Sequence, residues 1–434
     1  MRTHRKSWVA LTATFAGMAL VASGCSSGSD EATDVVPSAT SNEPVTLSLA
    51  TFNEFGYEDL IKEYMELNPN VTIEAKKAAT SNEARDNLNT RLAAGSGASD
   101  IEAIEVDWLP ELSQYPDKFV DLKDPSVEGR WLDWKVAQAT AADGKLLGYG
   151  TDIGPTGICY RGDLFEKAGL PTDREEVAAL FGGDAATWDK YFEVGAQFAA
   201  ADTGSAFFDS VSGTYQAMIN QVQNAYEDND GNIIALENAE VKKIYDQVLA
   251  AAADQSSHTG QWSEDWTAAF QKDGFATMVC PGWMLGVIEG NAAGVEGWDI
   301  ANVFPGGGGN WGGSFLTVPA MGEHPAEAKA LAAWLTAPEQ QVKAFKAKGT
   351  FPSQVDALTD PALLSQKNAF FQDAPTGQIL ADRAKAVTVA PFKGPNYFAI
   401  NDAMQQALAR VDVEKTDDAA SSWAKFEETV NNLG

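Results

Sequence analysis

The first part of the chain alternates between strand-like and helix-like spacing of its apolar residues. Apolar and polar side chains alternate along residues 45–52 (VTLSLATF), which is the spacing of a strand. Residues 57–69 (YEDLIKEYMELNP) then place apolar side chains on one helical face and end in a proline, and residues 71–77 return to strand spacing. This order predicts a β-α-β unit with a parallel sheet.

The same alternation continues along the rest of the chain. The pattern predicts a helix over residues 84–94, a strand over 101–106 and a helix within 238–255. A long helical stretch over residues 326–346 is interrupted by Pro338. Helices and strands therefore alternate throughout, and the predicted class is α/β.

Two stretches resemble ligand motifs but do not meet their requirements. Residues 306–313 (GGGGNWGG) contain a G-x-G-x-x-G order, yet a strand-like run follows where a dinucleotide site needs a helix. Residues 228–232 (DNDGN) suggest part of a calcium loop, but Tyr226 would occupy the first ligand position. We expect a hairpin turn there, and no metal or cofactor site.

Length and charge narrow the range of partners. With 434 residues, 44% of them hydrophobic, the chain is long enough for two domains. Its formal net charge of −30 argues against nucleic acid, whose phosphates need clusters of Lys and Arg.

The N-terminal segment has the pattern of an export signal. A basic start precedes an apolar run over residues 8–21, which is too short to span a membrane, and small residues come directly before Cys25. This arrangement resembles the lipobox of bacterial lipoproteins, so residues 1–24 are a predicted signal peptide and Cys25 a predicted lipid attachment site. The alternative is an ordinary secreted protein cleaved nearby. Residues 25–44 are polar and predict a flexible tether.

Two further cysteines lie in strand-like runs. In an exported protein, Cys159 and Cys280 could form a disulfide, or they could be two buried thiols that act as small apolar side chains.

Signatures of catalysis are scarce. The histidines that remain after signal removal, His258 and His324, lie in polar, loop-like contexts, and the sequence has no G-x-S-x-G, P-loop, CxxC or HExxH motif. We therefore predict no catalytic residues. A carboxylate glycosidase stays open as an alternative, because 61 acidic residues could supply its pair of carboxyl groups.

Aromatic residues beside polar ones offer a different chemistry. Sugars present flat C–H faces that stack on aromatic rings and hydroxyl groups that need acceptors and donors. Asp107 with Trp108, Asp152, and Trp283 after a Pro-Gly pair have this character at predicted strand ends. For any single aromatic residue, packing in the core is the alternative.

Several segments together resemble the extracellular solute-binding proteins, family 1, which serve carbohydrate ABC importers. The resemblance covers about Val45 to Leu433, and the variant in residues 157–177 is most similar to actinobacterial cellobiose- and xylobiose-binding proteins. The segments that carry it are residues 50–74, 91–112, 144–171, 270–286 and 311–341.

This resemblance implies an α/β, two-lobe periplasmic-binding-protein-like (type II) fold with a hinge and a ligand cleft between the lobes. The first lobe would comprise residues 45–155 and 313–358, and the second 156–312 and 359–434. The implied protein is a monomeric lipoprotein on the extracellular face of the cytoplasmic membrane. It would carry a β-linked gluco- or xylo-oligosaccharide to an ABC permease with a cytoplasmic ATPase. Another small solute on the same scaffold, such as a polyamine, is the alternative.

The resemblance also implies which residues contact the ligand. Trp283 would be the main stacking platform, Asp107 and Trp108 would contact the ligand from the first lobe, and Asp152 would accept a hydrogen bond near the hinge. The further candidates are Asn53, Glu54, Trp311 and Phe351, followed by Trp262, Asn396 and Tyr397.

Overall fold

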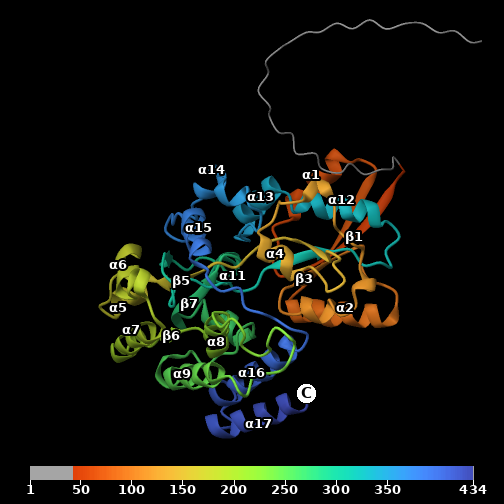
Figure 1. The fold of residues 1–434 in the computed structure, drawn as a ribbon. Coiled ribbons are helices and arrows are strands. Elements are labelled where there is room, and N and C mark those ends of the chain that lie inside the picture. The colour runs from red at the N-terminus through yellow and green to blue at the C-terminus, as the bar shows by residue number, and fades with distance from the viewer. Residues whose placement is uncertain (1–42, 434) are drawn as a thin grey trace, which may run out of the picture. The chain divides into compact units, whose positions relative to one another are not determined.

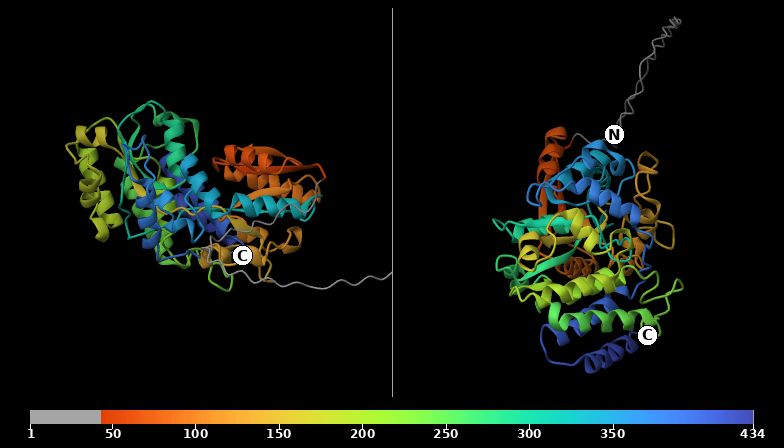
Figure 2. Two further views of the ribbon diagram at one scale, coloured as in Figure 1. Left: turned by 90° about the horizontal axis from the view of Figure 1, so that it is seen from above. Right: turned by 90° about the vertical axis from the view of Figure 1, so that its left-hand side faces the viewer.

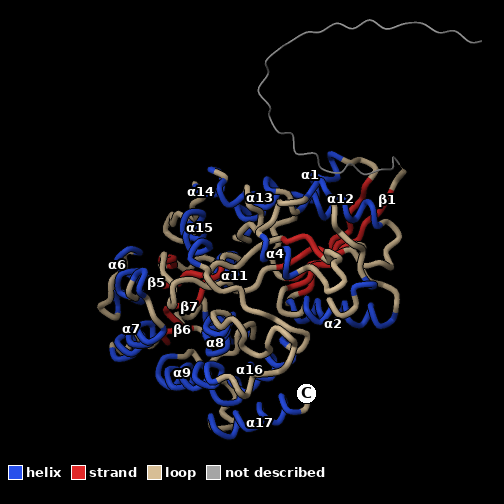
Figure 3. The backbone as a smooth tube through the Cα atoms, in the orientation of Figure 1, coloured by secondary structure: helices blue, strands red, loops and turns tan. Residues whose placement is uncertain are grey.

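The strands collect into two separate mixed sheets (Figures 1 and 3). The structure is a computed structural model that describes residues 43–433, all of which belong to one compact unit. The first sheet contains β1 (Val45–Phe52), β2 (Val71–Ala78), β3 (Ile101–Glu105), β4 (Gly148–Gly150) and β9 (Ser314–Thr317). The second contains β5 (Thr156–Arg161), β6 (Ala206–Phe208), β7 (Phe275–Pro281) and β8 (Trp298–Ala301). We call each sheet with its helices a lobe.

Helices cover both sheets. The α-helices are α1 (Glu58–Leu67), α2 (Ser81–Ala94), α3 (Leu109–Leu112), α4 (Asp133–Gln138), α5 (Gly162–Lys167), α6 (Arg174–Leu180), α7 (Trp188–Ala200), α8 (Val211–Ile219), α9 (Ala239–Gln255), α10 (Glu264–Ala269), α11 (Met284–Asn291), α12 (Pro325–Leu335), α13 (Pro338–Lys348), α14 (Pro361–Leu364), α15 (Thr376–Ala386), α16 (Tyr397–Asp412) and α17 (Ala419–Asn431). Short 3₁₀ helices span Pro116–Lys118, Pro125–Val127, Gly183–Ala185 and Ala357–Thr359.

The first sheet has the order β2-β1-β3-β9-β4. β1 pairs in parallel with β2 and β3, as the β-α-β pattern predicts. β9 lies antiparallel to both β3 and β4, so the prediction of a parallel sheet is wrong for this half. The reason is topological, because β9 returns from the second lobe and enters the first sheet from the opposite direction.

The core of the first lobe joins segments far apart in sequence. The rings of Tyr64 on α1 and Trp334 on α12 meet edge to face, with centroids 5.1 Å apart. Figures 1 and 2 show α12, in cyan, beside the orange N-terminal elements. The predicted break at Pro338 is confirmed, since α12 ends at Leu335 and α13 starts at Pro338.

The second sheet has the order β6-β7-β5-β8, with β5 antiparallel to both of its neighbours. Cys159 on β5 and Cys280 on β7 are joined by a disulfide, with Cα atoms 5.4 Å apart. Of the two alternatives for these cysteines, the structure has the disulfide and not the two free thiols. The bond ties the strand that leads to Trp283 to the centre of its sheet.

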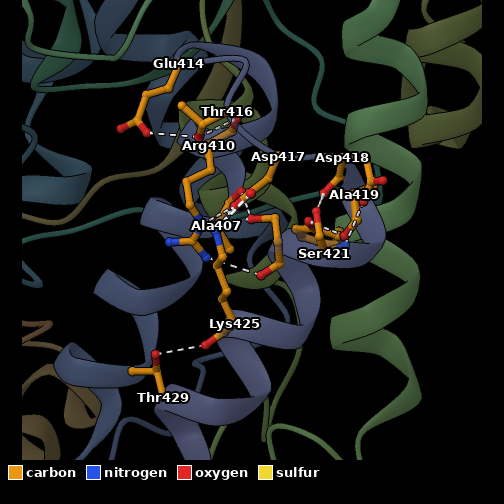
Figure 4. Close-up of polar contacts among 12 residues, drawn as sticks. Ala407, Arg410, Glu414, Thr416, Asp417, Asp418, Ala419, Ser421, Lys425 and Thr429 are labelled. Carbon is orange, nitrogen blue, oxygen red and sulfur yellow. Dashed lines mark hydrogen bonds and ion pairs between the residues drawn. The ribbon is translucent and has the colours of Figure 1, made fainter.

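The C-terminal helices α16 and α17 form a hairpin on the second lobe (Figure 4). Asp417, in the connection between them, pairs with Arg410 at 3.2 Å and with Lys425 at 2.7 Å. Trp423 on α17 packs against Tyr245 on α9, with ring centroids 5.1 Å apart. The last helices therefore belong to the core of the second lobe.

Three backbone segments cross between the lobes side by side. Ile153 donates its backbone N–H to the carbonyl of Phe351 at 2.8 Å, and Trp311 donates its own to the carbonyl of Gly154 at 2.8 Å. The Asn310 side chain accepts the backbone N–H of Gly154 at 2.8 Å. These crossings form the hinge region, whereas the residue boundaries assigned to the lobes above stay a prediction.

The remaining predictions concern single segments. Residues 228–232 form the expected turn, closed by hydrogen bonds between Asp228 and Asn232. The signal peptide, Cys25 and the tether up to residue 42 lie outside the described residues. Within residues 43–433, no helix has the length and apolar character needed to cross a membrane.

The hinge leads to a test of backbone packing. A Cβ atom at Gly154 would lie 1.7 Å from the carbonyl oxygen of Trp311, so Gly154→Ala must push the two crossing segments apart. We expect it to lower the free energy of unfolding by about 2 kcal/mol or more, measured by urea denaturation.

Gly290→Ala is the matched control, because no atom lies within 4 Å of a Cβ at this position in α11. It should leave the free energy of unfolding unchanged or raise it by up to about 1 kcal/mol. Equal stability of the two variants would contradict the steric argument.

Candidate functional site

A cavity of about 420 Å³ lies between the lobes, a size typical of small-molecule sites. Side chains from the ends of β1 and β3, the start of α2, the crossing segments, and α8, α11 and α16 surround it. The lining residues are Phe52, Asn53, Glu54, Phe55, Thr80, Ser81, Asn82, Glu105, Asp107, Asp152, Ser212, Gln216, Gln261, Trp262, Trp283, Val287, Trp311, Gly312, Gly313, Ser314, Thr350, Phe398, Asn401, Asp402 and Gln405.

Three tryptophans form one wall of the cavity. Trp283 follows β7 directly and precedes α11, so its ring is placed by both elements. Its indole N–H donates to the backbone carbonyl of Trp311 at 2.9 Å, and the Trp311 ring meets it edge to face at 5.6 Å. The Trp262 ring lies nearly parallel to that of Trp283, with centroids 6.1 Å apart and planes 23° apart. Together they form an aromatic wall in which Trp262 and Trp283 are nearly parallel and Trp311 stands edge-on to Trp283.

Trp262 has an unusual backbone for an aromatic residue. Its φ of 73° is in the left-handed region, and its side chain is 41% exposed. Such a conformation costs on the order of 1–2 kcal/mol for a residue with a side chain, and it tends to occur at functional sites. The neighbouring Trp266 supports the ring at 5.2 Å and is itself anchored by a hydrogen bond to Asp209 at 2.9 Å.

Carboxyl groups also line the cavity. Asp152 is buried, and its Oδ1 accepts hydrogen bonds from the Thr151 hydroxyl at 2.7 Å and the Ser314 backbone N–H at 2.9 Å. Burial raises the pKa of Asp152 above its ordinary value. Burial also raises the pKa of Glu105 to about 8, and the repulsion of Asp107 adds to this. Glu105 therefore holds its proton to a higher pH than an exposed glutamate does, and in its protonated form it can donate a hydrogen bond.

Glu54 keeps its charge for a different reason. Burial alone would raise the pKa of Glu54, but hydrogen bonding and charge from Lys77 and Lys348 lower it overall. The lysine ammonium groups lie 2.7 Å and 3.5 Å from its carboxylate. The side chain is thus an oriented acceptor at the end of β1.

Amide side chains from α8 and α16 complete the polar lining. Gln216 accepts hydrogen bonds from Asn401 at 2.9 Å and from Gln405 at 3.2 Å through the same oxygen. The side-chain oxygen of Gln405 is buried, with no hydrogen-bond partner among the described residues. A hydroxyl group of a ligand could supply the missing donor.

The described residues offer groups that can bind a polar ligand but no cluster that could hold a metal ion. Nowhere in residues 43–433 do three or more His, Cys, Asp or Glu side chains gather in a way that could hold a metal ion. The combination of an aromatic wall with fixed acceptors and donors suits a ligand rich in hydroxyl groups.

Comparison with known proteins agrees with this arrangement. The family profile described as "Bacterial extracellular solute-binding protein" matches residues 59–375. The chain belongs to this family. Its members bind solutes for transport and are not enzymes, so the prediction of a non-catalytic protein is confirmed.

Solved structures confirm the two-lobe α/β fold of this solute-binding protein. A crystal structure of an extracellular solute-binding protein of family 1 is 51% identical, covers 90% of this chain and 99% of its own, and superposes with a TM-score of 0.79. The ABC transporter associated binding protein from B. animalis subsp. lactis Bl-04, in complex with beta-1,6-galactobiose, is 19% identical, with coverages of 90% and 98% and a TM-score of 0.76.

A characterised relative carries a name that states its ligand. The arabinooligosaccharide-binding protein of Bacillus subtilis (strain 168) is 26% identical over 374 residues, which is 81% of each chain.

The structure brings most of the residues singled out from the sequence to the cavity of the solute-binding protein. Those that line it are Asn53, Glu54, Asp107, Asp152, Trp283, Trp311 and, from the weaker candidates, Trp262. Their roles as ligand contacts remain predictions.

Trp108 and Phe351 do not face the cavity, which corrects their expected placement. Trp108 is 1% exposed in the first-lobe core, where its indole N–H donates to Ser81 at 2.9 Å. Phe351 is 0% exposed and packs edge to face on Phe345. Both rings are enclosed by their own lobes, so neither is available for stacking.

The two remaining weak candidates, Asn396 and Tyr397, also lie away from the cavity. Asn396 donates hydrogen bonds from its backbone and side-chain nitrogens to Glu227, each at 3.1 Å. Tyr397 is buried in the core of the second lobe. Both serve to hold the start of α16.

Several lining residues were missed by the sequence patterns. Glu105 stands two residues before Asp107 at the end of a strand, so period-two alternation would place both side chains on the same side. Asn401 and Gln405 are four residues apart on α16 and share a helical face. Both spacings were visible, but nothing in the sequence shows that these faces meet a cavity.

Asp209, which accepts the hydrogen bond of Trp266 beside the aromatic wall, leads to a prediction about how stability depends on pH. Burial raises the pKa of Asp209 to about 7, although the Trp266 indole donates to its carboxyl group. The folded protein therefore holds a proton that the unfolded chain releases above its ordinary pKa. We expect the free energy of unfolding to fall as pH rises from about 4 to about 7, by at most about 1.4 kcal/mol per pH unit from this group.

The measurement is urea unfolding at several pH values. Asp209→Asn should remove this part of the slope, whereas Asp265→Asn, an exposed position on the helix that carries Trp266, should keep it. Identical slopes for Asp209→Asn and the unmodified chain would show that Asp209 does not hold the proton.

Proposed function

We propose that this solute-binding protein captures a neutral oligosaccharide between its two lobes and delivers it to the permease of an ABC importer. The observation that carries the proposal is the aromatic wall of Trp262, Trp283 and Trp311, which lines the same cavity as the carboxyl and amide groups.

The chemistry of each wall supports a sugar. The C–H face of a pyranose ring stacks on an indole ring, and Trp283 is fixed for that contact by its hydrogen bond to Trp311. Sugar hydroxyl groups can donate to Glu54, Asp152 and Gln405, and the protonated Glu105 can donate in return. The proposed role consists of binding the sugar and closing the hinge, and it breaks no bond in the sugar.

The names of the relatives narrow the sugars worth testing. Relatives are described as binding arabinooligosaccharide and beta-1,6-galactobiose. We propose a β-linked oligosaccharide, with gluco- and xylo-oligosaccharides as the first candidates, and we treat arabino- and galacto-oligosaccharides as competing arms of the same test. A carboxylate glycosidase is set aside because the family consists of binding proteins.

We also propose that the protein works at the extracellular face of the cytoplasmic membrane. The basic and apolar start, the small residues before Cys25 and the polar stretch after it support a lipid anchor with a tether. An ABC permease with a cytoplasmic ATPase would be the partner that accepts the sugar.

Isothermal titration calorimetry on a ligand panel tests the function. The panel contains cellobiose, xylobiose, arabinobiose, β-1,6-galactobiose, their trisaccharides, and putrescine as a non-sugar solute. We expect binding heat from at least one oligosaccharide and none from putrescine. Heat from putrescine alone, or from nothing on the panel, would overturn the proposal of a sugar.

The stacking role of Trp283 gives a sharper prediction. Trp283→Ala should weaken the tightest panel sugar about tenfold or more, because an aromatic contact of this kind contributes on the order of 1 kcal/mol or more. Trp283→Phe keeps a ring and should lose less.

Tyr115→Ala is the control for this substitution, since Tyr115 is a well-exposed aromatic residue outside the cavity. It should bind like the unmodified chain. If a folded Trp283→Ala protein binds with unchanged affinity, the ring packs against the protein rather than against the sugar.

A further inference from the structure

Residues 387–396, here called the strap, connect α15 to α16. Both helices belong to the second lobe, and hydrogen bonds hold the strap there. Phe392 donates its backbone N–H to the carbonyl of Gln223 at 2.7 Å, and the Gln223 side chain donates to the carbonyl of Ala390 at 2.9 Å. Figure 1 shows the strap, in blue, between α15 and α16.

One side chain of the strap reaches the other lobe. The ammonium group of Lys393 forms an ion pair with Asp107, which follows β3 in the first lobe and lines the cavity. The side chains are 5% and 16% exposed, so the pair is largely shielded from water. Lys393 also lies over the Tyr397 ring, 4.7 Å from its centroid. The ion pair therefore joins the lobes at the wall of the cavity.

The surroundings keep Lys393 charged. Burial is the largest influence on the pKa of Lys393 and acts to lower it, but the neighbouring acidic groups, Asp107 first among them, together outweigh burial, and the net pKa is raised above its ordinary value. Because the pair is enclosed, water cannot easily take the place of either partner. Removal of one partner therefore leaves the other as a buried charge without a counter-charge.

A second contact lies beside the ion pair. The guanidinium group of Arg85 on α2 is 4.0 Å from the centroid of the Phe398 ring at the start of α16. Arg85 is itself fixed to Glu111 of its own lobe at 2.7 Å. At this point of the chain, Tyr397 packs in the core of the second lobe and Phe398 packs against that of the first.

We propose that Lys393 is a positioning residue for ligand capture. Its ammonium group holds the carboxylate of Asp107 at the cavity wall and fastens the strap of the second lobe to the first lobe. Lys393 does not itself line the cavity, so it acts on the ligand through Asp107 and through the distance between the lobes. A contact that exists only when the lobes are together adds to the stability of the ligand-competent form. This inference rests on the proposed function, but its first readout needs no ligand.

The first experiment is small-angle X-ray scattering of the ligand-free chain. Lys393→Met keeps the length of the side chain and removes its charge, and we expect a larger radius of gyration because the lobes separate. Lys393→Arg keeps the charge and should restore the value of the unmodified chain. Lys145→Met is the control, since Lys145 pairs at 2.7 Å with Asp117 inside the first lobe.

The second experiment is calorimetry with the panel disaccharide that the unmodified chain binds most tightly. Lys393→Met should weaken its binding about tenfold, as expected for the loss of a shielded charge pair, and Lys393→Arg should recover most of the affinity. In a double-mutant cycle, adding Lys393→Met to Asp107→Asn should cost far less than it costs alone.

The outcomes separate this inference from the proposed function. An unchanged radius of gyration in Lys393→Met overturns the positioning role, whatever the panel shows. If no panel sugar binds, the proposed function fails, and the scattering result alone decides the role of Lys393. If Lys393→Met does not fold, Asp107→Asn removes the same ion pair and takes its place in the scattering experiment.

Discussion

The close approach of two crossing chains at Gly154 and Trp311 is the constraint on which the site depends. The backbone N–H of Trp311 donates to Gly154, and the carbonyl of Trp311 accepts the indole N–H of Trp283. One residue thus connects the hinge to the stacking wall. Because a side chain at Gly154 would collide with this carbonyl, the absence of a Cβ there sets where the platform stands relative to both sheets.

The two sides of the cavity are built with different rigidity. Trp283 directly follows the strand that carries Cys280 of the Cys159–Cys280 disulfide. The position of the aromatic wall is therefore fixed by a buried sheet. The wall formed by Gln216 and α16 instead depends on side-chain hydrogen bonds and on the strap that precedes this helix. A rigid aromatic wall can accept many pyranose rings, whereas adjustable amides in the same cavity can select among hydroxyl patterns.

Local periodicity predicted the elements well, because it reflects contacts within one segment. The strand Val45–Phe52 was placed correctly from alternation alone. The antiparallel strand Ser314–Thr317 could not be foreseen as such, since its direction depends on how the chain returns from the other lobe. The same difference between local and tertiary information applies to the site. Asp107 was found by its context, but Trp108 turns into the core and Glu105 turns toward the cavity, and only the tertiary packing decides this.

The net charge of −30 suggests a site that attracts cations, yet the carboxyl groups of the cavity are largely compensated. Glu54 is paired with Lys77 and Asp107 with Lys393, while burial raises the pKa of Glu105 to about 8 and so disfavours its negative charge. No Lys, Arg or His is among the described residues that line the cavity, so these cations neutralise the carboxylates from outside it. A polyamine would need unpaired carboxylates, and a phosphate would need exposed cations. Oriented acceptors with little net charge are what a neutral, hydroxyl-rich ligand requires, and the acidity of the rest of the chain has no part in its recognition.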